Sequence, residues 1–238
     1  MKSPQPILQT SEVSSLTPRL FIVDDKGGCY YVWQHNVAEA SMPEIIDLSR
    51  YQFKALIFDC DGTLAETAPH HFAAIRSALA EQNLILPREW YFARLGLSRT
   101  PLFDEFEAEF KLKINREAAI ARSEEIYCGN SQSISEIEHV AKIARQYSGV
   151  IPISVASGGG RRLVNHTLAA SGLRPIFDHV VTFDDVSEGK PSPTLFLEAA
   201  KRMAMKPIDC LVFEDSDEGL EAAHRAGMSA IDIRATKN

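Results

Sequence analysis

Short apolar runs alternate with stretches of helical periodicity from Phe53 to the end of the chain. The runs are almost continuously apolar, which is typical of strands buried on both faces of a sheet. Helical stretches separate the later runs, at 161–171, 193–203 and 218–226, and the last of them ends at Gly227 as a C-cap. This alternation predicts a Rossmann-like, doubly wound parallel α/β sheet. The predicted strands are 55–58, 151–155, 180–183, 210–213 and 230–233.

The alternation is interrupted between Asp61 and Ile151, where no run has strand character. Phe72, Ile75 and Leu79 in this interval fall on one helical face. We therefore predict a helical cap at 66–133, inserted between the two parts of a core formed by 53–65 and 134–238. The predicted helices of the interval are 70–82, 89–95, 101–110, 116–127 and 134–147, the last of which returns to the core.

Residues 1–52 differ in character from the rest of the chain and form a predicted N-terminal extension. Within it, the apolar segments 20–23 and 29–33 flank the turn sequence 24–28, which predicts a β-hairpin. Asp24 and Asp25 are acids typical of a turn, with a metal site as the alternative. The hairpin could extend the sheet, cover the cap or mediate dimerisation, and the sequence does not choose among these roles.

The composition of the 238-residue chain is that of a globular protein, with 45% hydrophobic and 24% charged residues. A net charge of −7 argues against nucleic-acid binding through bulk charge, although a local basic pocket for one small anion stays open. No apolar run has the length of a membrane span, and residues 1–10 lack the apolar segment of a secretory signal. The four cysteines are widely spaced, and Cys60 and Cys210 are expected to be small buried hydrophobes. These features predict a cytoplasmic protein.

Polar side chains follow the predicted strands, at the points where the strands end. Because ligands of open parallel sheets bind at the carboxyl ends of the strands, these side chains are expected to meet at one edge. The groups are Asp59 and Asp61 after the first strand, Ser157 after the second, Lys190 downstream of the third, and Glu214 and Asp215 after the fourth.

This set of side chains has the chemistry of a site for a cation and a phosphate group. Carboxylates in a small space oppose one another's ionisation, and a hard divalent cation such as Mg²⁺ removes the conflict through oxygen ligands. Lys190 supplies a positive charge for an anion, and Ser157 supplies a hydroxyl donor. The glycines that follow Ser157 let backbone N–H groups approach an oxyanion.

The sequence from Phe53 to Arg234 resembles the haloacid dehalogenase (HAD) superfamily, in its Mg²⁺-dependent phosphotransferase branch. A DxDGT motif alone is moderately specific, whereas all four motifs in order, each after an apolar run, are highly specific. The resemblance implies that Asp59 is the nucleophile that takes the phosphoryl group as an aspartyl-phosphate. It implies that Asp61 is the general acid and then the base for water, with its backbone carbonyl on Mg²⁺. A second acid at Asp61 favours phosphoryl chemistry over carbon–halogen cleavage.

The resemblance also implies roles for the remaining motif residues. Lys190 would bridge the nucleophile and the phosphoryl group and offset charge in the transition state. Glu214 and Asp215 would hold Mg²⁺ directly or through water. Donors to the phosphoryl oxygens are implied at Gly62, Thr63, Ser157 and Gly158.

Within the superfamily, the chain resembles the group with a small helical cap, which includes beta-phosphoglucomutase and sugar-phosphate phosphatases. The stretches 212–219 and 222–228 carry this closer resemblance. It implies that His71 faces the substrate and that Arg99 clamps a phosphate or the distal end of a sugar. The alternative for His71 is a helix residue that caps the helix or faces solvent. Aromatic residues expected in the cap core rather than against a sugar are Phe72, Trp90 and Phe103.

A mutase needs a second phosphate site, and the loop after Ser157 bears on that requirement. In beta-phosphoglucomutase this loop carries Ser, Lys and Asn side chains, whereas this chain has Gly159, Gly160 and Arg161. The loss of two side chains favours a phosphatase of small phosphorylated metabolites, with sugar phosphates as the expected class. A beta-phosphoglucomutase-type isomerase is the alternative, because Arg99 and Arg161 could hold a second phosphate. A binding protein without catalysis is disfavoured because the motif residues are present, and a monomer is expected.

Overall fold

The computed structural model describes residues 20–23, 29–32, 46–97, 99–130 and 134–236. The chain divides into two compact units, residues 1–42 and 43–238. In the first unit, β1 (Leu20–Val23) and β2 (Cys29–Val32) pair in antiparallel register. This pairing confirms the predicted hairpin, while the turn acids Asp24 and Asp25 lie outside the described residues.

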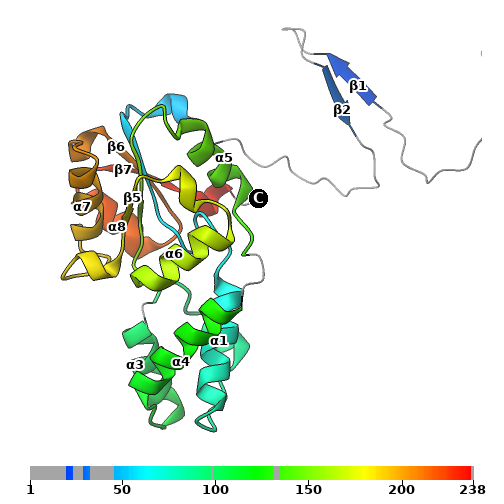
Figure 1. The fold of residues 1–238 in the computed structure, drawn as a ribbon, viewed down its shortest axis with the longest axis vertical. Coiled ribbons are helices and arrows are strands. Elements are labelled where there is room, and N and C mark those ends of the chain that lie inside the picture. Colours follow the sequence, from blue (N-terminus) through cyan, green and yellow to red (C-terminus); the bar gives the residue numbers. More distant parts are fainter. Residues whose placement is uncertain (1–19, 24–28, 33–45, 98, 131–133, 237–238) are drawn as a thin grey trace, which may run out of the picture. The chain divides into compact units, whose positions relative to one another are not determined.

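The second unit is built on a parallel sheet with the strand order β5-β4-β3-β6-β7 (Figure 1). The chain runs from β3 to β4 and β5 on one side and then crosses to β6 and β7 on the other, so the switch point lies at β3. The predicted α/β fold is confirmed. The strands are β3 (Ala55–Phe58), β4 (Ile153–Ala156), β5 (His179–Val181), β6 (Cys210–Glu214) and β7 (Ser229–Asp232).

Helices cover both faces of the sheet, and the strand residues alternate between two cores. Leu56 and Phe58 of β3 pack in one core with α5 and α6, whereas Ala55 and Ile57 pack in the other with α7 and α8. Burial on both faces explains why the strand sequences are almost continuously apolar. These helices are α5 (Glu138–Tyr147), α6 (Arg161–Ala170), α7 (Thr194–Arg202) and α8 (Asp217–Arg225).

The helices that follow β3 have a hydrophobic core of their own. Phe72, Ile75 and Leu79 of α1 are buried in it together with Trp90 and Phe103, as predicted. Figure 1 shows α1, α3 and α4 grouped at one end of this unit, beyond the sheet. The helices are α1 (Ala68–Ala80), α2 (Arg88–Phe92), α3 (Arg99–Phe110) and α4 (Arg116–Gly129).

The return from the cap to the core differs from the sequence prediction. The helix predicted for 134–147 begins only at Glu138. The residues before it are extended, because Glu136 forms an isolated β-bridge with Ala65. The chain therefore passes back beside the turn after β3 before the last helix of the interval starts.

The end of β5 also differs from the sequence prediction. The strand predicted for 180–183 ends at Val181, because the next residues form a short 3-10 helix, η3 (Phe183–Asp185). Thr182 and Asp185 form a capping box at its start, which stabilises the turn locally. All strand ends of this sheet, including that of β5, lie within two residues of the predicted ones.

Two expectations from the composition can be compared with the described residues. Cys60 and Cys210 are buried free thiols, as the apolar runs around them predict. In the part of the chain that the structure describes, no helix combines the length and the apolar character needed to cross a membrane. The cytoplasmic location stays a prediction.

Candidate active site

The strand β3 delivers Asp59 to the carboxyl end of the sheet. The Asp59 N–H donates to the Phe213 carbonyl at 3.0 Å, so pairing with β6 still holds the backbone at this position. The chain then turns, and Gly62 adopts a positive φ of 84°. A Cβ atom at residue 62 would lie 2.2 Å from Oδ2 of Asp215. Only glycine allows this turn to approach Asp215 so closely.

Lys190 lies between two buried carboxylates at the centre of the site. Its Nζ donates to Asp59 Oδ1 at 2.5 Å and to Glu214 Oε2 at 2.7 Å, and its side chain is 10% exposed. Burial alone would lower the pKa of Lys190, but the charges of Asp59 and Glu214 outweigh burial and raise it. Lys190 therefore stays protonated and presents a fixed positive charge beside Asp59.

Asp59, Glu214 and Asp215 form a carboxylate cluster whose ligand oxygens lie within 4.8 Å of one another. Burial raises the pKa of Asp59 well above its usual range; Lys190 lowers it, and the neighbouring carboxylates raise it further. A divalent cation among these oxygens would relieve the repulsion, and carboxylate oxygens are the ligands that Mg²⁺ prefers. The donor set therefore fits Mg²⁺. The cluster does not include the Asp61 side chain, which leaves its backbone carbonyl as the expected ligand.

The turn between β6 and α8 fixes Glu214 from several sides. Its Oε1 accepts from the N–H groups of Asp215 at 3.0 Å and Ser216 at 3.1 Å. The Ser216 hydroxyl also donates to Oε1, at 2.8 Å. Thr63 holds the neighbouring acid, because its Oγ1 donates to Asp215 Oδ1 at 3.2 Å. Gly219 in the first turn of α8 faces the Glu214 carboxylate, and a Cβ at residue 219 would lie 2.0 Å from Glu214 Cδ.

Replacing Gly219 with alanine is expected to destabilise the protein by about 1–3 kcal/mol, because the added methyl group overlaps the buried Glu214 carboxylate. Urea unfolding measures the change. Gly129→Ala in α4 is the matched control, because a Cβ there meets nothing within 4 Å, and alanine is the better helix former. Equal unfolding midpoints for the two variants would contradict the close packing of Gly219 against Glu214.

The Asp61 carboxylate contacts both the core and the cap. Its Oδ1 is 3.3 Å from His71 Nε2, and its Oδ2 is 3.5 Å from Ser157 Oγ. Burial raises the pKa of Asp61, but the hydrogen bond and charge of His71, with a hydrogen bond from Thr67, lower it overall. Ser157 Oγ accepts from the Gly159 N–H at 3.0 Å, which leaves its own proton for an acceptor in the site.

Tyr127 of α4 contacts the site, and the sequence prediction missed it. Its ring stacks on the His71 imidazole with a centroid distance of 4.3 Å. Its hydroxyl lies 2.8 Å from Thr167 Oγ1 of α6, in a buried hydrogen bond. Tyr127 therefore links the cap to the core and supports His71 beside Asp61. The only signal in the sequence is an apolar position on a helix face, which does not distinguish Tyr127 from a core residue.

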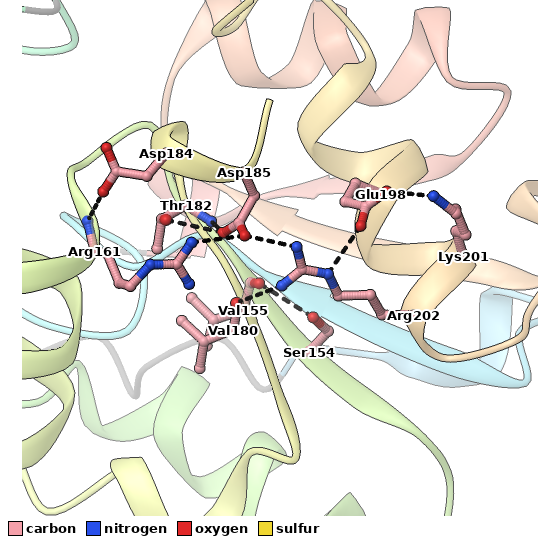
Figure 2. Close-up of polar contacts among 10 residues, drawn as sticks. All are labelled: Ser154, Val155, Arg161, Val180, Thr182, Asp184, Asp185, Glu198, Lys201 and Arg202. Atoms are coloured by element: carbon pink, nitrogen blue, oxygen red, sulfur yellow. Dashed lines mark hydrogen bonds and ion pairs between the residues drawn. The ribbon is translucent and has the colours of Figure 1, made fainter. Parts of the chain in front are cut away.

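The two arginines predicted to bind substrate have different surroundings. Arg99 of α3 donates to Ser123 Oγ at 2.8 Å. Burial lowers the pKa of Arg99, and the charge of Glu124 is the largest of those that oppose this effect. The contact of Arg99 with the substrate stays a prediction. Arg161, at the start of α6, donates instead to Asp185 Oδ1 at 2.7 Å (Figure 2). Its contact with the substrate stays a prediction.

Most of the predicted site residues therefore meet at the carboxyl end of the sheet. The contacts fix where these groups lie, while their roles in catalysis stay predictions. The residues brought to this end are Asp59, Asp61, Gly62, Thr63, Ser157, Gly158, Lys190, Glu214 and Asp215 from the core, with His71 from the cap.

A family model described as haloacid dehalogenase-like hydrolase matches residues 53–227. The chain belongs to this family. The matched segment runs from just before β3 to just beyond α8, so it contains every residue of the site. The hydrolase class predicted from the four motifs is thereby confirmed.

Relatives of this HAD-like hydrolase include named phosphatases. Fructose-1-phosphate phosphatase YqaB from Escherichia coli (strain K12) is 33% identical over 186 residues, which cover 77% of this chain and 97% of that protein. Protein CbbY from Rhodobacter capsulatus is 31% identical over 201 residues, covering 76% of this chain and 85% of that protein. Among solved structures, CbbY from Rhodobacter sphaeroides in complex with phosphate has a TM-score of 0.67 at 27% identity, covering 76% of this chain and 85% of that chain.

Proposed function

We propose that this HAD-like hydrolase is a Mg²⁺-dependent phosphatase that acts on small sugar phosphates through an aspartyl-phosphate on Asp59. The observation that carries the proposal is the contact of Asp59 with Lys190 inside a cluster of metal-ligating acids. This arrangement gathers a nucleophilic oxygen, a fixed positive charge and a set of oxygen ligands around one point. Transfer of a phosphoryl group to a carboxylate needs all three.

The reaction proceeds in two steps at phosphorus. An Asp59 oxygen attacks the phosphorus atom, the bond to the sugar oxygen breaks, and Asp61 gives that oxygen a proton. Asp61 then takes a proton from water as the water attacks phosphorus, which releases inorganic phosphate and restores Asp59. The lowered pKa of Asp61 in the free protein suits the second step. A phosphoryl dianion bound beside Asp61 raises this pKa, which favours the protonated form that the first step needs.

Positive charge and hydrogen-bond donors surround the phosphoryl group. Lys190 offsets the negative charge that Asp59 and the phosphoryl oxygens share during transfer. Bound Mg²⁺ would neutralise part of the same charge. Its ligands would be Asp59, Asp215 and the Asp61 carbonyl, with Glu214 acting directly or through water. Donors to the phosphoryl oxygens would be the Ser157 hydroxyl and the N–H groups of Thr63 and Gly158. The Gly62 N–H was also expected to be a donor, but it donates to the Ala65 carbonyl at 2.8 Å within the turn.

The cap and the relatives support sugar phosphates as the substrate class. His71 lies on a cap helix with its Nε2 3.3 Å from Asp61 Oδ1, where it would bind a hydroxyl group of a small metabolite, and Arg99 of α3 would bind its anionic end. The name of the E. coli relative specifies fructose 1-phosphate. A mutase is not favoured, because Gly159 and Gly160 offer no side chain to a second phosphate. We further propose that the cap (66–133) closes over the core to exclude bulk water and select the leaving group.

The purified protein with Mg²⁺ and a panel of sugar phosphates tests this function by ³¹P NMR. The panel contains beta-glucose 1-phosphate, fructose 1-phosphate and 6-phosphogluconate. Release of inorganic phosphate that stops when the metal is chelated supports the proposal. Conversion of beta-glucose 1-phosphate to glucose 6-phosphate without phosphate release would overturn it in favour of the mutase.

A further inference from the structure

The loop that carries Ser157 is held in place by the segment that follows β5. The Phe183 N–H donates to the Gly159 carbonyl at 3.1 Å. The Arg161 N–H, the first in α6, donates to Asp184 Oδ2 at 2.7 Å. The N-cap of α6, Gly160, has no capping side chain, and Asp184 satisfies one of the N–H groups that lack a partner within the helix at its start. The start of α6 therefore depends on residues that are distant in the sequence.

Asp185 joins this loop to the rest of the core through both of its carboxylate oxygens. Oδ2 accepts from the N–H and the hydroxyl of Thr182, at 2.9 and 3.0 Å. Oδ1 accepts from the guanidinium groups of Arg161 and Arg202, both at 2.7 Å (Figure 2). The side chain is 9% exposed. These donors match the roughly four acceptor positions of a carboxylate, so Asp185 is held on all sides.

Arg202 ties Asp185 to α7 and to β5. Its Nε donates to Glu198 Oε1 at 2.9 Å, and its Nη1 donates to the Val180 carbonyl at 3.2 Å. Figure 2 shows that the guanidinium groups of Arg161 and Arg202 approach Asp185 from opposite sides. The end of β5, α7 and the start of α6 are therefore connected through this one carboxylate.

The loop before α6 is closely packed, and a movement of it would displace the hydrogen-bonding groups of Ser157 and Gly158. Ser157 Oγ accepts from the Gly159 N–H at 3.0 Å and lies 3.5 Å from Asp61 Oδ2. A Cβ at residue 159 would lie 3.0 Å from Val164 Cγ2, so the loop packs closely on α6. A displacement of about 1 Å would carry the Ser157 hydroxyl and the Gly158 N–H away from a phosphoryl group, and misplacement of that size costs about a hundredfold in rate.

We propose that Asp185, together with Arg161 and Arg202, is a positioning residue that fixes the loop of Ser157 and Gly158 for binding the transferring phosphoryl group. Arg161 then acts through Asp185 and not on the substrate. The proposal rests on the proposed function, because it assigns a task within phosphoryl transfer. It adds a residue, Asp185, that touches neither the substrate nor the metal ligands.

The variants Asp185→Asn and Arg161→Met, and the double variant, test this role. The measurements are kcat and KM for phosphate release, and the dissociation constant of orthovanadate in Mg²⁺ by calorimetry, because vanadate adopts the five-coordinate geometry of phosphoryl transfer. Each single variant is expected to lower kcat and to weaken vanadate binding about tenfold to a hundredfold, with little change in KM. The kcat and the vanadate affinity of the double variant are expected to be no lower than those of Asp185→Asn, because both substitutions remove the same Arg161–Asp185 contact.

Asp209→Asn is the matched control. Asp209 precedes β6 at the opposite end of the sheet and pairs with Lys54 at 3.0 Å. The same substitution there removes an ion pair from the same domain, and it is expected to leave both kcat and vanadate binding at wild-type values. If Asp209→Asn lowered kcat and weakened vanadate binding as much as Asp185→Asn, the proposal would be overturned. Loss of any ion pair in this domain would then be enough to produce the effect.

Other outcomes would overturn the proposal in different ways. If Arg161→Met raises KM while Asp185→Asn changes nothing, Arg161 binds the substrate directly. If a folded variant binds vanadate as tightly as the wild type, the loop does not depend on Asp185. Arg161→Met keeps the test decisive should Asp185→Asn fail to fold, because its side chain is half exposed. Vanadate binding needs no turnover, so the two failures are distinguishable. A wild type that binds vanadate but releases no phosphate refutes the proposed function, whereas equal vanadate binding by an active wild type and the folded variants refutes the positioning role.

Discussion

Replacing Asp59 with asparagine is expected to reduce phosphate release by more than about a thousandfold, because an amide oxygen cannot form the acyl phosphate. The fold is expected to survive. Burial raises the pKa of Asp59 well above its usual range, so the ionised carboxylate destabilises the metal-free protein, and a neutral side chain of the same shape removes that cost. Thermal unfolding in a chelator should therefore give a midpoint no lower than that of the wild type.

These two readouts separate loss of the nucleophile from loss of structure. Lys190 keeps its contact with Glu214 at 2.7 Å in this variant, so the positive charge stays in the site. If turnover of the variant stays within a factor of about ten of the wild type, the activation barrier has risen by less than about 1.4 kcal/mol. That result would exclude Asp59 as the nucleophile. A large drop in the unfolding midpoint would instead show that Asp59 is a structural ion-pair partner.

Replacing Lys190 with methionine is expected to abolish turnover and also to destabilise the metal-free protein by about 3–5 kcal/mol, because Asp59 and Glu214 are left buried without a cation. Urea unfolding in a chelator measures the loss. Added Mg²⁺ is expected to raise the stability of the variant more than that of the wild type, because a bound cation replaces part of the missing charge.

Lys54→Met provides the control for this substitution. Lys54 pairs with Asp209 at 3.0 Å, but its side chain is 71% exposed, so the loss of this ion pair is expected to change stability little. A Lys190→Met variant as stable as Lys54→Met in the chelator would contradict the placement of Lys190 between two desolvated carboxylates.

The central part of the site could be predicted because parallel sheets convert chain order into spatial proximity. Asp59, Ser157 and Glu214 lie far apart in the sequence, yet each lies at or directly after the end of a strand, and β3, β4 and β6 are neighbours in one parallel sheet. Their carboxyl ends therefore lie at the same edge of the sheet, independently of the conformation of the loops. The buried, continuous apolar character of these strands was enough to place the polar residues that follow them.

The residues around this centre depend on contacts that no local pattern encodes. The predicted contact of Arg161 with the substrate stays a prediction, whereas its contact with Asp185 was not predicted, because a 3-10 turn after β5 sets the direction of Asp185. The Thr182 and Asp185 capping box is visible in the sequence as a Thr-x-x-Asp pattern and could have located this turn. Tyr127 could not be found in the same way, because its contact with Thr167 depends on how the cap meets the core.

The predicted start of one helix was wrong for the same physical reason. The helix predicted from 134 starts at Glu138 because Glu136 pairs with Ala65, which lies before the cap in the sequence while Glu136 lies after it. Helical periodicity reports which side chains share a face, and it does not report a backbone partner supplied by a distant turn. The missed features are therefore those in which long-range backbone or side-chain contacts override the local sequence.

The most direct test of the account is to look for the phosphoryl group on Asp59. The Asp61→Asn variant is expected to accumulate the aspartyl-phosphate from a substrate whose leaving group needs no proton, because the variant lacks the base that activates water. Acid-quenching this variant during reaction with Mg²⁺ and p-nitrophenyl phosphate, whose aryl oxygen leaves without a proton, should give one phosphorylated peptide in mass spectrometry, containing Asp59 and losing its phosphoryl group to hydroxylamine. Wild-type phosphate release with no phosphorylated Asp59 peptide in either protein would contradict the account.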